Sequence, residues 1–248
     1  MHDFLEALRF LTVLPLPRTS SRKKGSVARS MFYFPLVGFL IGIVSLWFFV
    51  WFRKFFPERI ANFILLITPL VLSGGLHLGG FAGFCDGFFS GKTKEETLRI
   101  MKDSQIRVWA AAGVTLLLLA KFELLQELPL KSMTFLMAMT ASRWSQVVLS
   151  YFLPVARPSG GLGEEGAQKI GLRELIGASA FLFFVTLSLA WVGFFAFLGL
   201  LIFLWLLALL FKKRVGGVTG DLIGATSETT ELFILLFVTA LHQIWPGL

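Results

Sequence analysis

The acidic residues that could take part in catalysis are few, and they lie beside glycines or basic residues. Three of the four aspartates are Asp86, which precedes a glycine, Asp103, which follows a lysine, and Asp221, which follows the run Gly-Gly-Val-Thr-Gly. Carboxylates bind Mg²⁺, whereas basic side chains and backbone amides bind phosphate oxygens. These residues predict a site for a phosphorylated substrate, with Asp86, Asp103 and Asp221 as candidate Mg²⁺ ligands or bases.

Two glutamates extend this acidic set into a long apolar segment near the end of the chain. Glu228 and Glu231 are three residues apart, so a helix places them on one face. Charged residues at membrane depth are costly and usually functional. Glu228 is therefore a further catalytic candidate, although a structural ion pair with a basic residue such as Arg143 is the alternative.

Glycine-rich segments provide the second part of this pattern. Glycines recur every fourth residue from 75 to 91, which on a helix predicts one face for close packing against another helix. The segment 157–163 (Arg-Pro-Ser-Gly-Gly-Leu-Gly) could bind phosphate through its amides, or serve as a plain connector. The candidate substrate-binding residues are Arg29, His77, Lys102, Arg143, Arg157, Gly161 and Gly217, and for His77 a packing role is the alternative.

The composition places this chemistry in a membrane. Of the 248 residues 56% are hydrophobic and only 15% are charged, whereas soluble domains have about 25% charged residues. The mean hydropathy is +0.77. These values exclude a soluble globule and intrinsic disorder, and the continuous apolar runs disfavour a transmembrane β-barrel. The single cysteine, Cys85, excludes an intramolecular disulfide. We expect an all-α, polytopic membrane protein forming one domain over residues 1–248.

The apolar runs predict about seven membrane-spanning helices. Runs of about 20 residues are long enough to cross the bilayer. Seventeen lysines and arginines then fall on the side of the N-terminus and four on the other side, so the positive-inside rule predicts a cytoplasmic N-terminus and a cytoplasmic candidate site. The predicted spans are residues 31–52, 60–85, 108–125 and 132–153, two spans within 175–211 that turn near 193–199, and 222–245.

Several motifs follow one another along almost the whole chain. They include 14–17 (Leu-Pro-Leu-Pro), 74–78 (Gly-Gly-Leu-His-Leu), 86–91, 100–104 and 216–221. In this order they resemble the cobalamin synthase family, the adenosylcobinamide-GDP ribazoletransferases of vitamin B12 assembly. The family's second-span motif has aspartates at the positions of Gly79 and Gly83, so this chain retains one of its three acids.

The resemblance implies the reaction and its partners. Adenosylcobinamide-GDP would react with α-ribazole or its 5′-phosphate, giving GMP and cobalamin or its phosphate, with Mg²⁺ as cofactor. It implies a multi-pass protein of the plasma (inner) membrane with its active face in the cytoplasm. It is compatible with a homo-oligomer or a complex with other B12-assembly enzymes. We expect no nucleic-acid partner.

The two missing aspartates leave a second interpretation open. A catalytically impaired relative could still bind a corrinoid or a protein partner after losing its metal-binding face. A transporter is a weaker third interpretation, because transporters often contain inverted repeats and the sequence shows no internal repeat.

Overall fold

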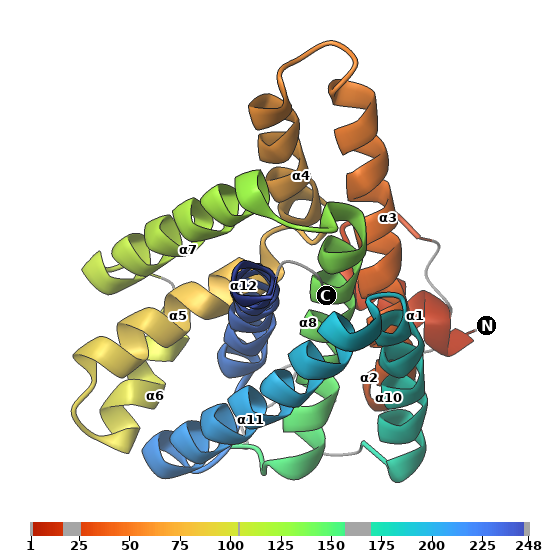
Figure 1. Cartoon of the computed structure of the whole chain (residues 1–248). Coiled ribbons are helices and arrows are strands. Elements are labelled where there is room, and N and C mark those ends of the chain that lie inside the picture. Colours follow the sequence, from red (N-terminus) through yellow and green to blue (C-terminus); the bar gives the residue numbers. More distant parts are fainter. Residues whose placement is uncertain (1, 17–25, 104, 157–169, 246–248) are drawn as a thin grey trace.

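The computed structural model describes residues 2–16, 26–103, 105–156 and 170–245, and the regular elements in these ranges are helices (Figure 1). The all-α prediction is therefore confirmed. The helices are α1 (His2–Leu11), α2 (Ser26–Ser30), the 3₁₀ turn η1 (Met31–Tyr33), α3 (Phe34–Phe52), α4 (Glu58–Leu72), α5 (Leu76–Ser90), α6 (Lys94–Lys102), α7 (Val108–Glu127), α8 (Lys131–Phe152), α10 (Leu172–Leu187), α11 (Ala190–Val215) and α12 (Gly220–Ile244).

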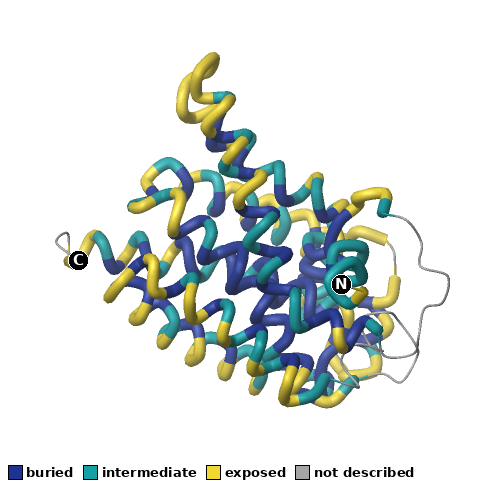
Figure 2. Tube along the Cα trace, turned by 90° about the vertical axis from the view of Figure 1, so that its right-hand side faces the viewer, coloured by how far each residue is buried: buried dark blue, intermediate teal, exposed yellow. Residues whose placement is uncertain are grey.

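Helix α8 lies at the centre of the fold. It is buried along most of its length and packs against α3, α10 and α12 (Figure 1). Figure 2 shows that buried residues gather in the interior of the molecule. Helix α12 in turn packs against α5 and α7, and α5 also packs against α6 and α7. The candidate acids of α5 and α12 are therefore brought together on one side of this central helix.

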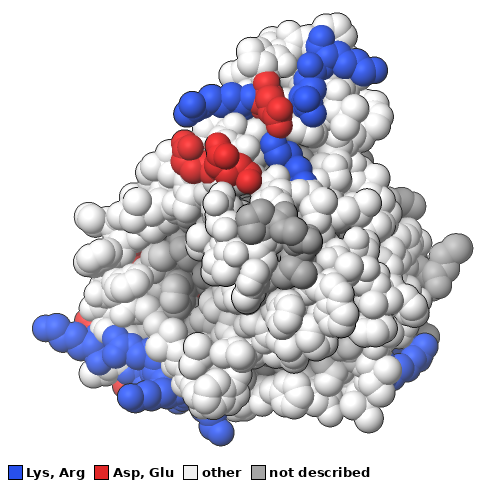
Figure 3. All heavy atoms as spheres, viewed as in Figure 1, with Lys and Arg blue, Asp and Glu red and all other residues white. Residues whose placement is uncertain are grey.

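The membrane assignment is supported by helix length and composition. Within the described residues, the four segments Ser26–Phe52, Val108–Glu127, Ala190–Val215 and Gly220–Ile244 are long and apolar enough to span a bilayer. A bent pair, α4 with α5, would make a fifth. On the face drawn in Figure 3, charged side chains gather at two ends of the molecule and leave an uncharged band between them. The count of seven spans and the N-in orientation stay predictions.

The prediction of one continuous helix over residues 60–85 is wrong. Helices α4 and α5 are separated at 73–75 and meet at an angle of 89°. Gly74 and Gly75 have φ values of +61° and +69°, a left-handed conformation that glycine adopts without a steric penalty. The second span motif therefore begins on a new helix, α5, rather than continuing the direction of α4.

The turn within residues 175–211 also lies elsewhere than predicted. The chain turns at Ser188 and Leu189, not near 193–199, and Ala190 opens α11 with a φ of +48°. Gly193 lies inside α11, where a Cβ would collide with the backbone carbonyl of Thr186 at the end of α10. The glycine therefore permits the two helices to approach closely after the turn, rather than forming the turn.

Candidate functional site

Asp221 lies where α12 crosses α5. A Cβ added at Gly80 would be 2.8 Å from the Asp221 carbonyl oxygen, and one added at Gly83 would be 3.3 Å from the Asp221 Cγ. The Asp221 side chain therefore lies directly against the glycine face of α5. A Cβ at Gly79 would meet no atom within 4 Å, so the space beside this residue is open.

The loop before α12 fixes the position of Asp221. The Val218 amide donates to the Pro154 carbonyl and the Ala156 amide to the Val218 carbonyl, each at 2.8 Å, which ties this loop to the end of α8. A Cβ at Gly217 would collide with the Pro154 carbonyl. The Thr219 hydroxyl then caps α12 by accepting from the Leu222 amide at 3.3 Å. Gly217, predicted to bind substrate, is thus required for packing at this position.

Asp86 holds the start of α7. The residue is 3% exposed, and its two carboxylate oxygens accept from the backbone amides of Arg107 and Ala110, each at 2.8 Å. Arg107 is the N-cap residue of α7 and Ala110 is the third residue of the helix. In a capping box, the amides at these two helix positions are bound by side chains of the N-cap and N3 residues themselves. Here one carboxylate from another helix, Asp86 of α5, binds both amides.

Lys102 and Asp103 line an open pocket at the junction of α6 and α7. This pocket has a volume of about 460 Å³, and Arg99 and Arg107 also line it. The Gln105 amide donates to Asp103 at 3.2 Å and Arg107 Nη2 at 3.0 Å, and these hydrogen bonds lower the pKa of Asp103. Three cationic side chains around one carboxylate make the pocket suitable for an anion such as phosphate.

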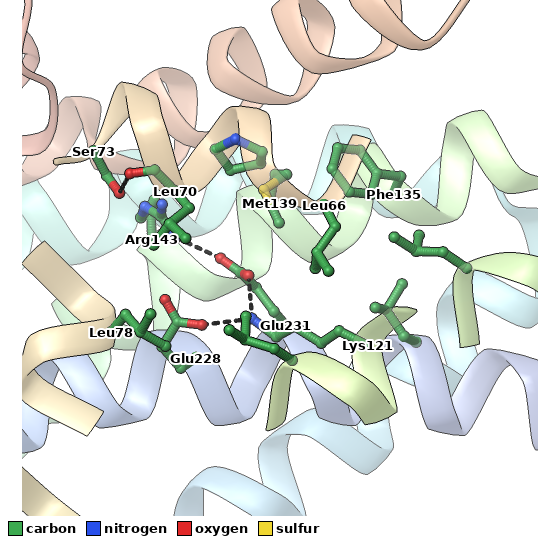
Figure 4. Close-up of a pocket in the computed structure, with 14 residues that line it drawn as sticks. Leu66, Leu70, Ser73, Leu78, Lys121, Phe135, Met139, Arg143, Glu228 and Glu231 are labelled. Atoms are coloured by element: carbon green, nitrogen blue, oxygen red, sulfur yellow. Dashed lines mark hydrogen bonds and ion pairs between the residues drawn. The ribbon is translucent and has the colours of Figure 1, made fainter. Parts of the chain in front are cut away.

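Glu228 and Glu231 belong to a buried ion cluster with Lys121 and Arg143 (Figure 4). Lys121 Nζ lies 2.6 Å from an oxygen of each glutamate, and Arg143 Nη1 lies 2.7 Å from Glu231 and 2.8 Å from the Ser227 hydroxyl. These contacts favour the alternative given for Glu228, a structural ion pair, over direct catalysis. The partner of Glu228 in this pair is Lys121. The sequence signal for Lys121 was its occurrence in an apolar span, where a charge is costly.

The cavity beside this cluster is small. Its volume is about 30 Å³, and its lining includes all four charged residues and Ser73. A single water needs roughly 10–15 Å³ of cavity volume, so the cavity has room for about two or three waters. A nucleotide or a corrinoid does not fit in this cavity, and the substrate contact of Arg143 stays a prediction.

Of the remaining candidates, the structure describes His77 and Arg29. His77 is buried on α5, and its Nε2 is 3.4 Å from Gln146 Nε2 of α8. Arg29 on α2 forms a partly exposed ion pair with Asp3 of α1, at 3.6 Å. Arg157 and Gly161 lie outside the described residues.

The described residues do not form the predicted three-carboxylate Mg²⁺ site. Among them no three His, Cys, Asp or Glu side chains are placed to share a metal ion. Both oxygens of Asp86 accept amide hydrogen bonds, and Asp103 is paired with Arg107. The requirement for Mg²⁺ stays a prediction.

Comparison with known proteins identifies the family. The model of the cobalamin-5-phosphate synthase family matches residues 3–239. The chain belongs to this family. It is 34% identical to the adenosylcobinamide-GDP ribazoletransferase of Desulforamulus reducens over 96% of both chains, and 35% identical to that of Desulfitobacterium hafniense over 93% of both. The enzyme of the same name from Chlorobium phaeobacteroides is 33% identical, over 94% of this chain and 96% of the relative. No solved structure matches this chain.

As a cobalamin-5-phosphate synthase family member, the protein is a transferase of cobalamin biosynthesis. The family match covers every element described above, from α1 to most of α12. It therefore includes the α5–α12 crossing, the basic pocket and the buried ion cluster.

Proposed function

We propose that the protein joins adenosylcobinamide-GDP to α-ribazole or α-ribazole 5′-phosphate. The ribose hydroxyl attacks the cobinamide-side phosphorus, the new O–P bond forms, and the bond from this phosphorus to the bridging oxygen of GMP breaks. The products are GMP and adenosylcobalamin or its 5′-phosphate. The observation that carries this proposal is the family match over residues 3–239, with relatives of that name matched along nearly their whole length.

The described residues suggest how the chain could assist this transfer. Asp221, against Gly83 of α5, is our candidate base for the ribose hydroxyl proton. The pocket of Arg99, Lys102 and Arg107 is our candidate site for the pyrophosphate oxygens. Asp86 connects the two regions, because it lies one helical turn after Gly83 and binds the Arg107 amide. In this proposal Asp86 is a positioning residue rather than a metal ligand.

The proposed setting is the inner membrane, with the site at the cytoplasmic face. The apolar helices support a membrane location, and the distribution of lysine and arginine along the sequence supports this orientation. The alternative of an impaired relative gains no support from the comparisons, because the matched relatives are named as transferases. Assembly as a homo-oligomer or with other B12-assembly enzymes stays a prediction.

The test is GMP release by the purified protein in lipid nanodiscs. Wild type supplied with adenosylcobinamide-GDP and α-ribazole should release GMP, and release should require both substrates. Asp221→Asn should reduce kcat about 100-fold or more, the range that general-base catalysis contributes. Glu58→Gln, the same carboxylate-to-amide change at an exposed ion pair on α4, is the matched control and should match wild type. Absence of GMP release by wild type at any Mg²⁺ concentration contradicts the proposed function, and full activity of Asp221→Asn contradicts the role of Asp221.

A further inference from the structure

Three contacts join α5, α7 and α12 into a closed set. Asp86 of α5 caps the start of α7, Lys121 of α7 bridges two glutamates of α12, and Asp221 of α12 lies against Gly83 of α5. Each helix is therefore tied to the other two by specific residues. A shift of α7 relative to α12 would change how α12 meets α5.

Helical geometry places the ion cluster close to the start of α12. Glu228 follows Asp221 by seven residues, which is two turns and about 10 Å along the helix axis. The two side chains therefore lie on the same side of α12. On α7, Lys121 lies eleven residues after the capped residue Ala110, about 16 Å further along the axis. The Asp86 cap and the Lys121 bridge thus hold α7 at two well separated points.

The charges of the ion cluster are balanced and desolvated. Lys121 is 4% and Arg143 1% exposed, and Glu228 and Glu231 are 9% and 6% exposed. Two positive and two negative side chains sum to zero. Removing one member leaves an uncompensated buried charge, which is strongly destabilising, whereas removing a matched pair does not. The effect of the cluster on stability can therefore be separated by experiment from its effect on the position of α12.

We propose that Lys121 is a positioning residue of the transfer site, fixing the first two turns of α12 so that Asp221 stays against α5. The role of Asp221 in the transfer rests on the proposed function, whereas the position of α12 does not. Lys121 itself lies in the buried cluster and contacts the two glutamates, so it acts through α12 and not on the substrate.

The experiment compares Lys121→Met, Glu228→Gln and the double variant in nanodiscs. Each single change leaves one net charge in the cluster and should lower the Tm. The double variant has the Arg143–Glu231 pair alone, is neutral, and should regain most of the lost Tm. Its backbone amides at 220–227 should nevertheless exchange with deuterium at least about tenfold faster than in wild type, because the bridge to α7 is gone.

Kinetics supply the second measurement. In the double variant, kcat should stay about 10- to 100-fold below wild type, since small misplacements of reacting groups have effects of this size. KM should change less than about twofold, because the basic pocket is untouched. Lys121→Arg keeps the charge and the donors, and it should retain more of kcat than Lys121→Met. The matched control is Lys131→Met with Glu58→Gln, a Lys–Glu pair between α8 and α4 at 2.7 Å with Glu58 exposed. It should leave kcat and the exchange at 220–227 unchanged.

The outcomes separate the two proposals. If the double variant regains its Tm and its amides at 220–227 exchange with deuterium at the wild-type rate, the positioning role is overturned. The ion cluster then contributes only to stability. Faster exchange with an unchanged kcat supports the effect of Lys121 on α12, but it contradicts the part given to Asp221 in the proposed function. An equal fall in kcat and an equal rise in exchange at 220–227 in the Lys131 and Glu58 control would also overturn the proposal, because the effect would not be specific to this cluster.

Discussion

Replacing Asp86 tests whether this carboxylate caps a helix or binds a metal. Asp86→Ala removes the acceptor of two amide hydrogen bonds, both 2.8 Å long and both made to the carboxylate of a buried residue. Loss of a capping side chain costs about 0.5–2 kcal/mol, and hydrogen bonds to charged acceptors are roughly twice as strong as neutral ones. We therefore expect the free energy of unfolding to fall by about 2 kcal/mol.

This change should be visible as a shift in Tm. For a chain of 150–250 residues, 1 kcal/mol corresponds to about 2–4 °C, so Asp86→Ala should lower the Tm by about 4–8 °C. Asp86→Asn keeps one carbonyl oxygen and should lose about half as much. The assay is thermal unfolding of the purified protein in nanodiscs, followed by far-UV circular dichroism. Asp103→Ala is the control, because its carboxylate is solvent-exposed and its described hydrogen-bond donors, Gln105 and Arg107, are near neighbours in the sequence.

The comparison with and without Mg²⁺ decides between the two roles. A capping carboxylate gives the same loss of Tm in millimolar Mg²⁺ and in chelator. A metal ligand gives a Tm that rises with Mg²⁺ in wild type and no longer does so in Asp86→Ala. The second result, or a Tm unchanged by Asp86→Ala, would refute the capping interpretation.

Two further predictions concern the glycine face of α5 and the topology. Gly79→Asp enters open space and should be tolerated, whereas Gly83→Asp places a carboxylate beside Asp221 and should lower the Tm in chelator. If this face retains metal affinity, the double aspartate variant should regain Tm with Mg²⁺ and lower the Mg²⁺ concentration needed for GMP release; no response to Mg²⁺ would argue that it is only a packing surface. Reporter fusions after Lys94 should report the cytoplasm and fusions after Lys131 the outside, and the reverse result would remove the cytoplasmic assignment of the site.

The sequence by itself determined the fold class, the membrane environment and the family. Long uncharged runs have few stable arrangements other than helices in a bilayer, because every backbone amide needs a partner there. The order of the glycine and aspartate motifs was specific enough to predict the family, which the comparisons confirmed. Local pattern also indicated that Glu228 and Glu231 share a face, since a helix fixes that relation between near neighbours.

Only the tertiary structure decided what each charged residue contacts. Asp86 and Asp221 have the same side chain and similar glycine neighbours, yet one caps α7 and the other lies in the α5–α12 crossing. Lys121 and Glu228 are 107 residues apart, so nothing local relates them. The bend at Gly74 and Gly75 was likewise not predictable from hydropathy, which measures how apolar a run is but not the direction of its helix. The left-handed conformation of these glycines turns α5 toward α7 and α12. Partners across the fold depend on how helices pack, and that packing brings together residues that the linear pattern keeps far apart.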